Sequence, residues 1–147
     1  MTIREMQSTD RAEVFAMMRT FYDSPALLTK VPDDVLRRNI STCISNSPYL
    51  EGFVFEHNQQ TIGYGMVATS YSTERGGLCV WLEDIYIKPA FRGRGYGSTF
   101  FAFVEQRFAG MAVRYRLEAA RDNTVALQFY GKMGYSETEY CAMIKEN

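Results

Sequence analysis

The sequence predicts one α/β (α+β) domain that covers residues 1–147. A chain of 147 residues is large enough to enclose a single hydrophobic core, and its 46% hydrophobic content is ordinary for a globular protein. Apolar residues recur with a period of two in some segments and of three to four in others, which predicts the order β-α-α-β-β-β-α-β-α-β. A strand, a glycine-rich turn and a helix follow one another from Trp81 onward. Size, element order and this unit favour a central sheet with helices packed on it.

The first third of the chain is expected to form one strand and two helices. Residues 1–6 alternate loosely between apolar and polar and suit a strand. Ser8-Thr9-Asp10 offers helix caps, and the apolar period that follows ends at Ser24-Pro25. A second helix is expected to start at Asp33 and to stop at Asn46-Ser47-Pro48.

The middle of the chain reads as a β-hairpin followed by a central strand. The segments Leu50–Glu56 and Thr61–Ser70 are the two arms, with a turn at residues 57–60 that places His57 in solvent. Ser72–Gly77 is polar and contains glycine, so we expect a flexible connection there. The central strand then runs from Trp81 to Ile87 and ends at Lys88-Pro89, because proline cannot donate to a ladder.

The last third is expected to form two helices and two strands. A helix runs from about Tyr96 to Phe108, and Val113–Ala119 alternates as a half-buried strand with Val113 facing inward. Asp122 or Asn123 caps a second helix that ends at Gly134, where glycine suits a left-handed cap. A closing strand is expected from an alternation of apolar side chains, namely Tyr140, Ala142 and Ile144.

Composition argues against several classes of protein. No apolar run reaches membrane-spanning length, and the N-terminus lacks the layout of a signal peptide, so we expect no membrane partner. Three widely spaced cysteines and one histidine, with no C-x-x-C, favour buried free thiols in a reducing cytoplasm and no metal site. The net charge of −1 does not suggest nucleic acid. Residues 85–132 nevertheless carry eight basic and three acidic side chains, whereas the remainder is acidic.

The segment from Trp81 to Ser98 has the design of an anion-binding site. Glycine-rich backbone at a helix start offers unpaired amides to a phosphate, and the helix dipole favours negative charge there. A nucleotide P-loop does not fit, because no Gly-Lys-Ser/Thr follows at the required distance. The dinucleotide pattern nearly fits at Gly93 and Gly95, and Glu118 could then read a ribose hydroxyl, but its third glycine is Ser98. A plain turn is the other alternative.

Two motifs together carry a resemblance to a known family. Arg92-x-x-Gly95-x-Gly97, after an apolar strand closed by Pro89, resembles the acetyl-CoA pyrophosphate signature Q/R-x-x-G-x-G/A of the GNAT N-acetyltransferase superfamily. Residues 123–135, NTVALQFYGKMGY, resemble the family's N-x-x-A-x-x-F-Y-x-x-x-G-F segment. The motifs occur in the family's order and separation, and the predicted elements extend the resemblance over essentially the whole chain.

The resemblance implies a fold and a binding mode for acetyl-CoA. The family's sheet is mixed and mostly antiparallel, with about six to seven strands, about four helices, and fourth and fifth strands that splay apart. The pyrophosphate would lie on the glycine turn, and pantetheine between the splayed strands, held by Asn123. The implied cofactor-binding residues are Ile85, Tyr86, Ile87, Arg92, Gly93, Arg94, Gly95, Tyr96, Gly97, Ser98 and Asn123. The linker Ser24–Val31 would be either a substrate loop or an ordinary surface loop.

Acetyl transfer to an amine needs a base and an acid. An amine at neutral pH must lose a proton before it attacks, and a carboxylate can receive that proton. Strand alternation places Glu83 and Asp84 on opposite sides, so only one can face the cleft. Trp81-Leu82-Glu83-Asp84 resembles the Y-L-E-D segment of spermidine/spermine N-acetyltransferases, which implies that Glu83 is the base. The family places a tyrosine near the coenzyme sulfur, which implies that Tyr130 protonates the departing thiolate, while amides near Ile85–Ile87 meet the developing oxyanion.

The sequence therefore predicts a metal-free N-acetyltransferase that moves an acetyl group directly from acetyl-CoA to a primary amine. The acceptor is a small cationic, polyamine-like molecule or a protein amine, because the acidic half of the chain and Glu83 favour a cation. Two alternatives stay open at this point: a nucleotide-cofactor (NAD-type) oxidoreductase and a non-catalytic acyl-CoA sensor. Family habit also implies a homodimer that pairs through C-terminal strands, and the cysteine pattern favours a cytoplasmic location.

Overall fold

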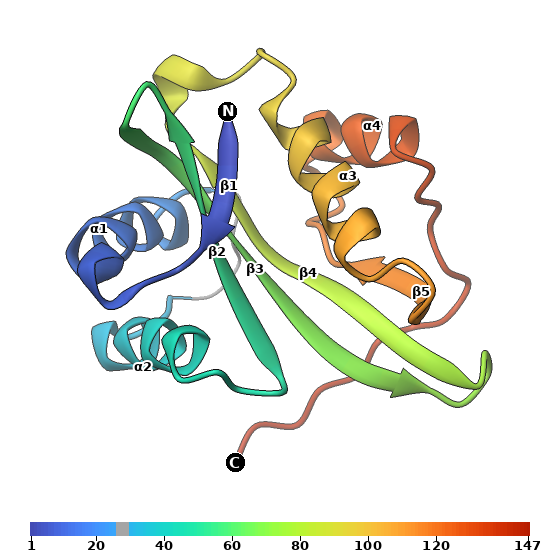
Figure 1. Ribbon diagram of the computed structural model, residues 1–147. Coiled ribbons are helices and arrows are strands. Elements are labelled where there is room, and N and C mark those ends of the chain that lie inside the picture. Colours follow the sequence, from blue (N-terminus) through green and yellow to red (C-terminus); the bar gives the residue numbers. More distant parts are fainter. Residues whose placement is uncertain (26–29) are drawn as a thin grey trace.

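The computed structural model, which describes residues 1–25 and 30–147, has one five-stranded sheet with two helices on each face (Figure 1). The strands lie in sequence order, and all neighbours are antiparallel except the last two, which are parallel. The strands are β1 (Thr2–Glu5), β2 (Leu50–His57), β3 (Gln60–Ser72), β4 (Gly77–Ile87) and β5 (Ala112–Leu117). The helices are α1 (Arg11–Tyr22), α2 (Asp33–Ile44), α3 (Tyr96–Arg107) and α4 (Thr124–Lys132).

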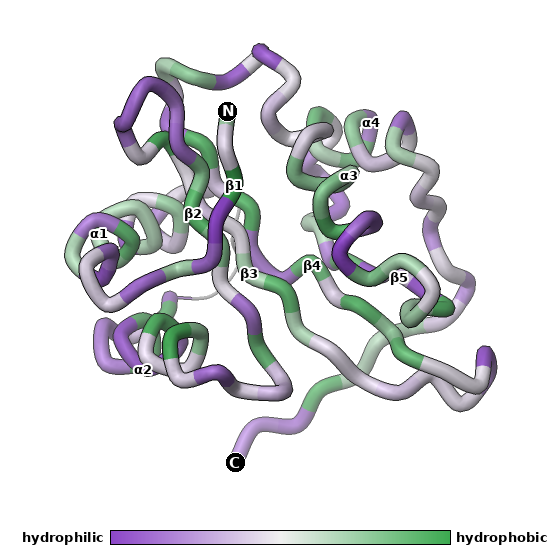
Figure 2. The backbone as a smooth tube through the Cα atoms, viewed as in Figure 1, coloured by the Kyte–Doolittle hydropathy of each residue, from purple (hydrophilic) through white to green (hydrophobic). Residues whose placement is uncertain are grey.

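Each face of the sheet has its own apolar cluster. Helices α1 and α2 cover one face, where Met18, Leu36 and Tyr64 are buried. Helix α3 covers the other, where its Phe100 packs on Phe55 with ring centroids 4.9 Å apart. Figure 2 shows hydrophobic residues along the central strands and hydrophilic residues at the tip between β2 and β3. No helix of the described chain is long and apolar enough to cross a bilayer.

Local sequence signals account for most element boundaries. Asn58 and Gln59 both have positive φ, which is the turn geometry that matches the twist of a tight hairpin. Asn123 caps α4 by accepting from the amide of Ala126 at 3.2 Å. Gly134 ends that region with a φ of 88°, the left-handed conformation that glycine adopts most easily. The predicted helices and the predicted hairpin are therefore confirmed.

The predicted closing strand is wrong, and so is the count of six to seven strands. The described residues after α4 contain no strand, and Tyr140 and Ile144 are 75% and 85% exposed. Apolar side chains occupy both alternation phases here, since Cys141 and Met143 interleave with the expected inward residues. The pattern consequently defines no single face that burial could stabilise. Cys141 is also exposed, contrary to the expectation of buried thiols.

Two further expectations are corrected around β4. Ser72–Gly77 is no flexible connection, because β3 runs to Ser72, β4 starts at Gly77, and the Gly76 amide donates to Ser72 O at 2.7 Å. Polar residues can pair as a solvent-exposed extension of a hairpin. Val113 is 47% exposed rather than inward, because the β4–β5 register shifts and leaves it without a partner.

The two parallel strands part where the site begins. Pairing of β4 with β5 ends at Leu82 and Leu117, while β4 continues to Ile87. The splay expected between the fourth and fifth strands is therefore found, and it leaves one side of the end of β4 unpaired.

Candidate active site

The glycine turn before α3 presents a row of free backbone amides. Gly93 and Gly95 have φ of 73° and 78°, which turns the chain back toward the helix, and Gly95 is the N-cap. The first helical hydrogen bond runs from Thr99 N to Gly95 O at 3.1 Å. Within the described ranges, no acceptor is found for the six amides of residues 93–98. Consecutive free amides at a helix start form a concave anion site.

Side chains around this turn hold its shape. Arg92 Nε donates to Ile87 O at 2.8 Å, and Arg94 donates to Ala90 O at 3.1 Å. In the described chain neither guanidinium contacts a carboxylate. Both positive charges are therefore available to an anion. A Cβ on Gly97 would lie 3.1 Å from Phe129, so this glycine lets α3 and α4 pack closely.

His57 lies beside the turn, which its sequence position did not suggest. The Tyr96 hydroxyl is 3.2 Å from His57 Nδ1, and the two rings pack with centroids 5.8 Å apart. The hairpin tip of β2 and β3 thus supports the first residue of α3. Only the tertiary packing reveals this contact.

The unpaired end of β4 carries two of the three predicted backbone positions. The Lys88 amide donates to Ile62 O on β3 at 2.8 Å. Because backbone groups alternate in direction along a strand, those of Ile85 and Ile87 point to the opposite side, where β5 has ended. Tyr86 pairs with Tyr64 on β3 and buries its ring against that residue, so its backbone faces the sheet.

Two cavities meet at Glu83. The first, of about 480 Å³, is lined by residues 68–70 of β3, by residues 81–84 in the middle of β4, by Glu118 just after β5 and by Tyr22 of α1. The second, of about 220 Å³, lies at the splay and includes Asn123 and Tyr130 from the α4 region. Leu82, Glu83 and Glu118 line both cavities. The two cavities are therefore adjacent, and Glu83 borders both of them.

A β-bulge places Glu83 there. Met66 pairs with Asp84 and Val67 with Leu82, so Glu83 is an extra residue with no partner on β3. Glu83 and Asp84 both line the first cavity, Asp84 is held by Tyr22 and Tyr64, and Glu83 lines the second cavity as well. The Glu83 side chain is exposed within the cavity. Partial burial, together with the negative charges of Asp84 and Glu118, raises the pKa of its carboxyl above the ordinary value.

Asp84 is held from two elements. It is only 5% exposed, and it accepts from Tyr22 Oη at 2.9 Å and from Tyr64 Oη at 3.0 Å. Burial raises the pKa of Asp84, and the two hydroxyl donors act in the opposite direction. Its neighbour Trp81 donates from Nε1 to Ser70 Oγ at 3.0 Å, while Arg116 stacks 4.3 Å above the indole. Sequence reasoning did not find this tyrosine–aspartate cluster, since no local pattern links residues so far apart.

Tyr130 lines the second cavity. Its ring packs against Phe101 at 5.8 Å, and burial raises the pKa of its hydroxyl. Among the described residues the hydroxyl has no hydrogen-bond partner. Asn123 lines the same cavity, with its side-chain oxygen engaged in the helix cap.

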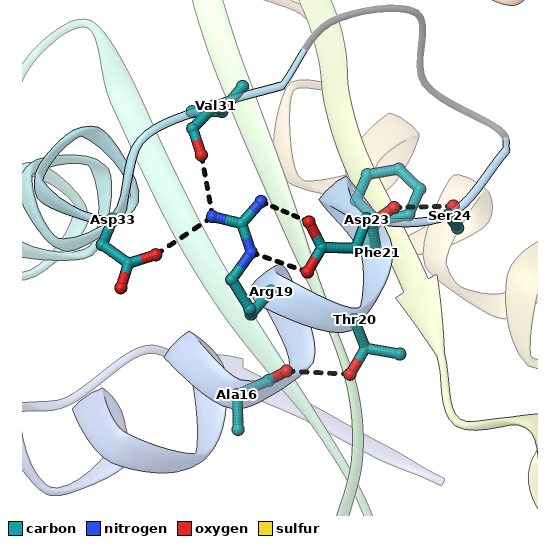
Figure 3. Close-up of polar contacts among 8 residues, drawn as sticks. All are labelled: Ala16, Arg19, Thr20, Phe21, Asp23, Ser24, Val31 and Asp33. Carbon is teal, nitrogen blue, oxygen red and sulfur yellow. Dashed lines mark hydrogen bonds and ion pairs between the residues drawn. The ribbon is translucent and has the colours of Figure 1, made fainter.

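Arg19 ties together the two helices beside the first cavity. Its guanidinium bonds both carboxylate oxygens of Asp23 and also contacts Val31 O at 2.7 Å and Asp33 at 3.0 Å (Figure 3). The end of α1, which carries Tyr22, is thereby fixed to the start of α2. Of the predicted linker Ser24–Val31, residues 26–29 lie outside the described part of the chain. No group of three or more potential metal ligands is found in the parts described.

Comparison with known proteins agrees with this architecture. The model of the acetyltransferase (GNAT) family matches residues 13–135. The chain belongs to the GNAT acetyltransferase family. This membership confirms the predicted class, an acetyl-CoA-dependent N-acetyltransferase, and it removes the alternative of an NAD-type oxidoreductase.

Relatives of this GNAT protein include thialysine N-epsilon-acetyltransferases. That of Bos taurus is 30% identical over 106 residues, which are 65% of this chain but only 60% of the bovine protein. That of Sus scrofa is 28% identical over 143 residues, which are 90% of this chain and 82% of the porcine one.

Solved structures share the fold at low identity. A possible acetyltransferase from Clostridium difficile 630 superposes with a TM-score of 0.86 at 18% identity, covering 99% of this chain and 97% of the other. AAC(6')-Iy in complex with a bisubstrate analogue, CoA-S-monomethyl-acetylneamine, has a TM-score of 0.81 at 20% identity, with the same coverage.

Proposed function

We propose that this GNAT protein acetylates a primary amine of a small cationic acceptor, with Glu83 as the proton acceptor and Tyr130 as the proton donor. The observation that carries the proposal is that Glu83 lines both cavities, so one carboxylate borders an acidic chamber and the chamber that holds Tyr130. A protein amine is the second acceptor class.

The residues around the glycine turn fit the coenzyme. Six free amides at residues 93–98 and the unpaired guanidinium groups of Arg92 and Arg94 would hold the pyrophosphate. The backbone of Ile85, the amide of Ile87 and the Asn123 side chain would hold the pantetheine arm along the splay, while Ile87 O already accepts from Arg92. Bound acetyl-CoA supplies the acetyl thioester. These groups would direct the thioester into the second cavity, which Tyr130 lines.

Glu83 is better suited to accept the proton than its neighbour. Asp84 is buried and both of its oxygens already accept from tyrosines, whereas Glu83 is exposed in the cavity and has no hydrogen-bond partner within the described residues. The raised pKa makes Glu83 a stronger base than an ordinary carboxylate. A tyrosine hydroxyl is protonated at neutral pH, and burial raises the pKa of Tyr130 further, so its proton would be present for a departing thiolate.

The charge of the first cavity favours a cation. Glu83, Asp84 and Glu118 line it, and no basic residue of the described chain does. Trp81 adds an aromatic wall against which an alkyl chain can pack. The names of the relatives, thialysine N-epsilon-acetyltransferases, point the same way, because thialysine carries a side-chain amine. A cytoplasmic location stays a prediction.

Glu83→Gln tests the proposal because it keeps the shape and removes the basic function. We expect the rate to fall most at low pH, where the amine is protonated, and less at high pH, where free amine is abundant. The rate is measured as thiol release from acetyl-CoA over a panel of cationic, neutral and anionic amines. A loss by the same factor at every pH would mean that Glu83 only positions the acceptor.

Two outcomes of the same panel would redirect the assignment. If anionic or neutral amines outperform cationic ones, the acceptor class is wrong. If acetyl-CoA binds but no amine is acetylated, the chain is the acyl-CoA sensor rather than an enzyme. Calorimetric titration with CoA separates binding from turnover.

A further inference from the structure

Asp84 is a buried carboxylate with no assigned role in the reaction. It lies directly after the bulged residue Glu83 and is 5% exposed. Its two oxygens accept hydrogen bonds from opposite directions, one from Tyr22 on α1 and one from Tyr64 on β3. A well-packed apolar residue would stabilise such a position at least as well as a buried charge does. Stability alone therefore does not explain an aspartate here.

The geometry of the cluster favours the ionised form of Asp84. An ionised carboxylate only accepts hydrogen bonds, whereas a protonated one must also donate through one oxygen. Both oxygens of Asp84 are occupied by donors, at 2.9 and 3.0 Å. The tyrosine hydroxyls remain protonated, because burial and the nearby Asp84 charge raise the pKa of both Tyr22 and Tyr64. Burial raises the pKa of Asp84, and the two tyrosine donors counteract that effect and favour a negative charge at the lining of the first cavity.

We propose that Asp84 is a positioning residue for Glu83, whose buried charge, fixed by Tyr22 and Tyr64, keeps Glu83 in the proton-accepting role. The inference rests on the proposed function of Glu83. Two adjacent like charges favour proton uptake by the one that is free to take it, and Asp84 is not free. Both residues line the first cavity, and after burial the charge of Asp84 is a cause that raises the pKa of the Glu83 carboxyl.

Other titratable groups around the pair come from every neighbouring element. They are Tyr22 on α1, Cys43 on α2, Tyr64 on β3, Tyr86 on β4, Glu118 after β5 and Tyr130 on α4. Arg92 reaches the Tyr86 ring at 5.6 Å. Among the residues that the structure describes, Asp84 and Glu118 are the charges that raise the pKa of Glu83, and Glu118 is exposed. Salt should screen Glu118 far more than it screens Asp84.

A carboxyl ¹³C NMR titration of Glu83 tests the inference without relying on turnover. Glu83→Gln identifies the signal by its disappearance. Asp84→Asn should move the Glu83 midpoint to lower pH, and the change should persist at high salt. The matched variant Glu118→Gln should cause a change that high salt removes. An unchanged or raised midpoint in Asp84→Asn would overturn the proposal.

A second variant covers the case in which Asp84→Asn does not fold by circular dichroism. Tyr22→Phe keeps the carboxylate and removes one donor that favours its charged form, so the Glu83 midpoint should again fall. An unchanged midpoint in folded Tyr22→Phe would equally overturn the proposal.

Kinetics separate this proposal from the function on which it rests. Asp84→Asn should lower kcat/KM roughly tenfold in the wild-type background and have little effect in Glu83→Gln, because residues that act through one another are not additive. The same loss in both backgrounds would make Asp84 merely structural. If Glu83→Gln retains full activity, the proposed base is wrong, whatever the NMR midpoint shows.

Discussion

Tyr130 is the residue whose single hydroxyl the proposed chemistry needs most. We expect Tyr130→Phe to lower kcat by ~10²–10⁴-fold, the usual contribution of a general acid, because only the proton donor is lost. The affinity for acetyl-CoA should hardly change, since the ring still packs on Phe101. Single-turnover kinetics and calorimetry measure the two effects separately. Burial raises the pKa of Tyr130, so its ionisation should impose no loss of activity near neutral pH.

Tyr135→Phe is the matched control for this prediction. Tyr135 lies in the same aromatic cluster, with its ring 6.5 Å from that of Tyr130, but it lines neither cavity. The control should keep wild-type turnover. Equal turnover in Tyr130→Phe, with the chemical step shown to limit the rate, would remove Tyr130 from the mechanism.

At the residue scale, motifs predicted some site members and missed others for a physical reason. Glu83, Asn123 and Tyr130 lie within the segments that resemble family motifs, and the structure brings them to one cavity. Tyr22 and Tyr64 come from distant segments and meet only because α1 packs on the sheet beside Asp84. The bulge at Glu83 also escaped sequence reasoning, since strand alternation carries no signal for an extra residue.

The glycine turn is the element on which acetyl-CoA binding should depend. Gly95→Val places a branched side chain at the left-handed N-cap of α3, adjacent in the chain to the free amides of residues 96–98. We expect the rise in melting temperature caused by CoA to disappear, because binding to the native state produces that rise. Thermal unfolding with and without CoA provides the measurement.

Gly110→Val controls for the backbone strain of that change. Gly110 has a φ of 75° and, like Gly95, no atom within 4 Å of the place that a Cβ would occupy, but it lies after the other end of α3. Both variants should lose about 1–2 kcal/mol of stability, the usual cost of a left-handed residue with a side chain. Only Gly95→Val should lose the response to CoA. A normal CoA response in Gly95→Val would move the pyrophosphate site elsewhere.

Elements with strong local signals were predictable, whereas those that depend on pairing were not. The hairpin at Asn58, the cap at Asn123 and the left-handed Gly134 follow from local turn and cap chemistry. The expected strand around Tyr140 needed a partner edge and one apolar face, and its sequence encodes neither. The extension of β3 and β4 past Ser70 depends on pairing between polar segments, which hydropathy does not reveal.

At the scale of the whole molecule, charge and shape both separate the proposed coenzyme site from the proposed acceptor site. The basic turn before α3 lies at one end of the splay, while the first cavity gathers acidic side chains and is walled in part by α1. Two ligands of opposite charge would therefore reach Glu83 from different chambers. This arrangement suits direct transfer between two bound substrates, without a covalent enzyme intermediate.

A homodimer is the prediction that concerns the surface as a whole. The C-terminal residues Tyr140, Met143 and Ile144 are 75%, 92% and 85% exposed, and β5 is an edge strand whose own Val113 is exposed. A second chain can pair with an unpaired strand edge and bury the exposed apolar side chains near it. We expect light scattering to give about twice the chain mass of 16.9 kDa. Removal of residues 138–147 should return the protein to a monomer. A mass of 16.9 kDa for the full chain across a wide concentration range would exclude the dimer.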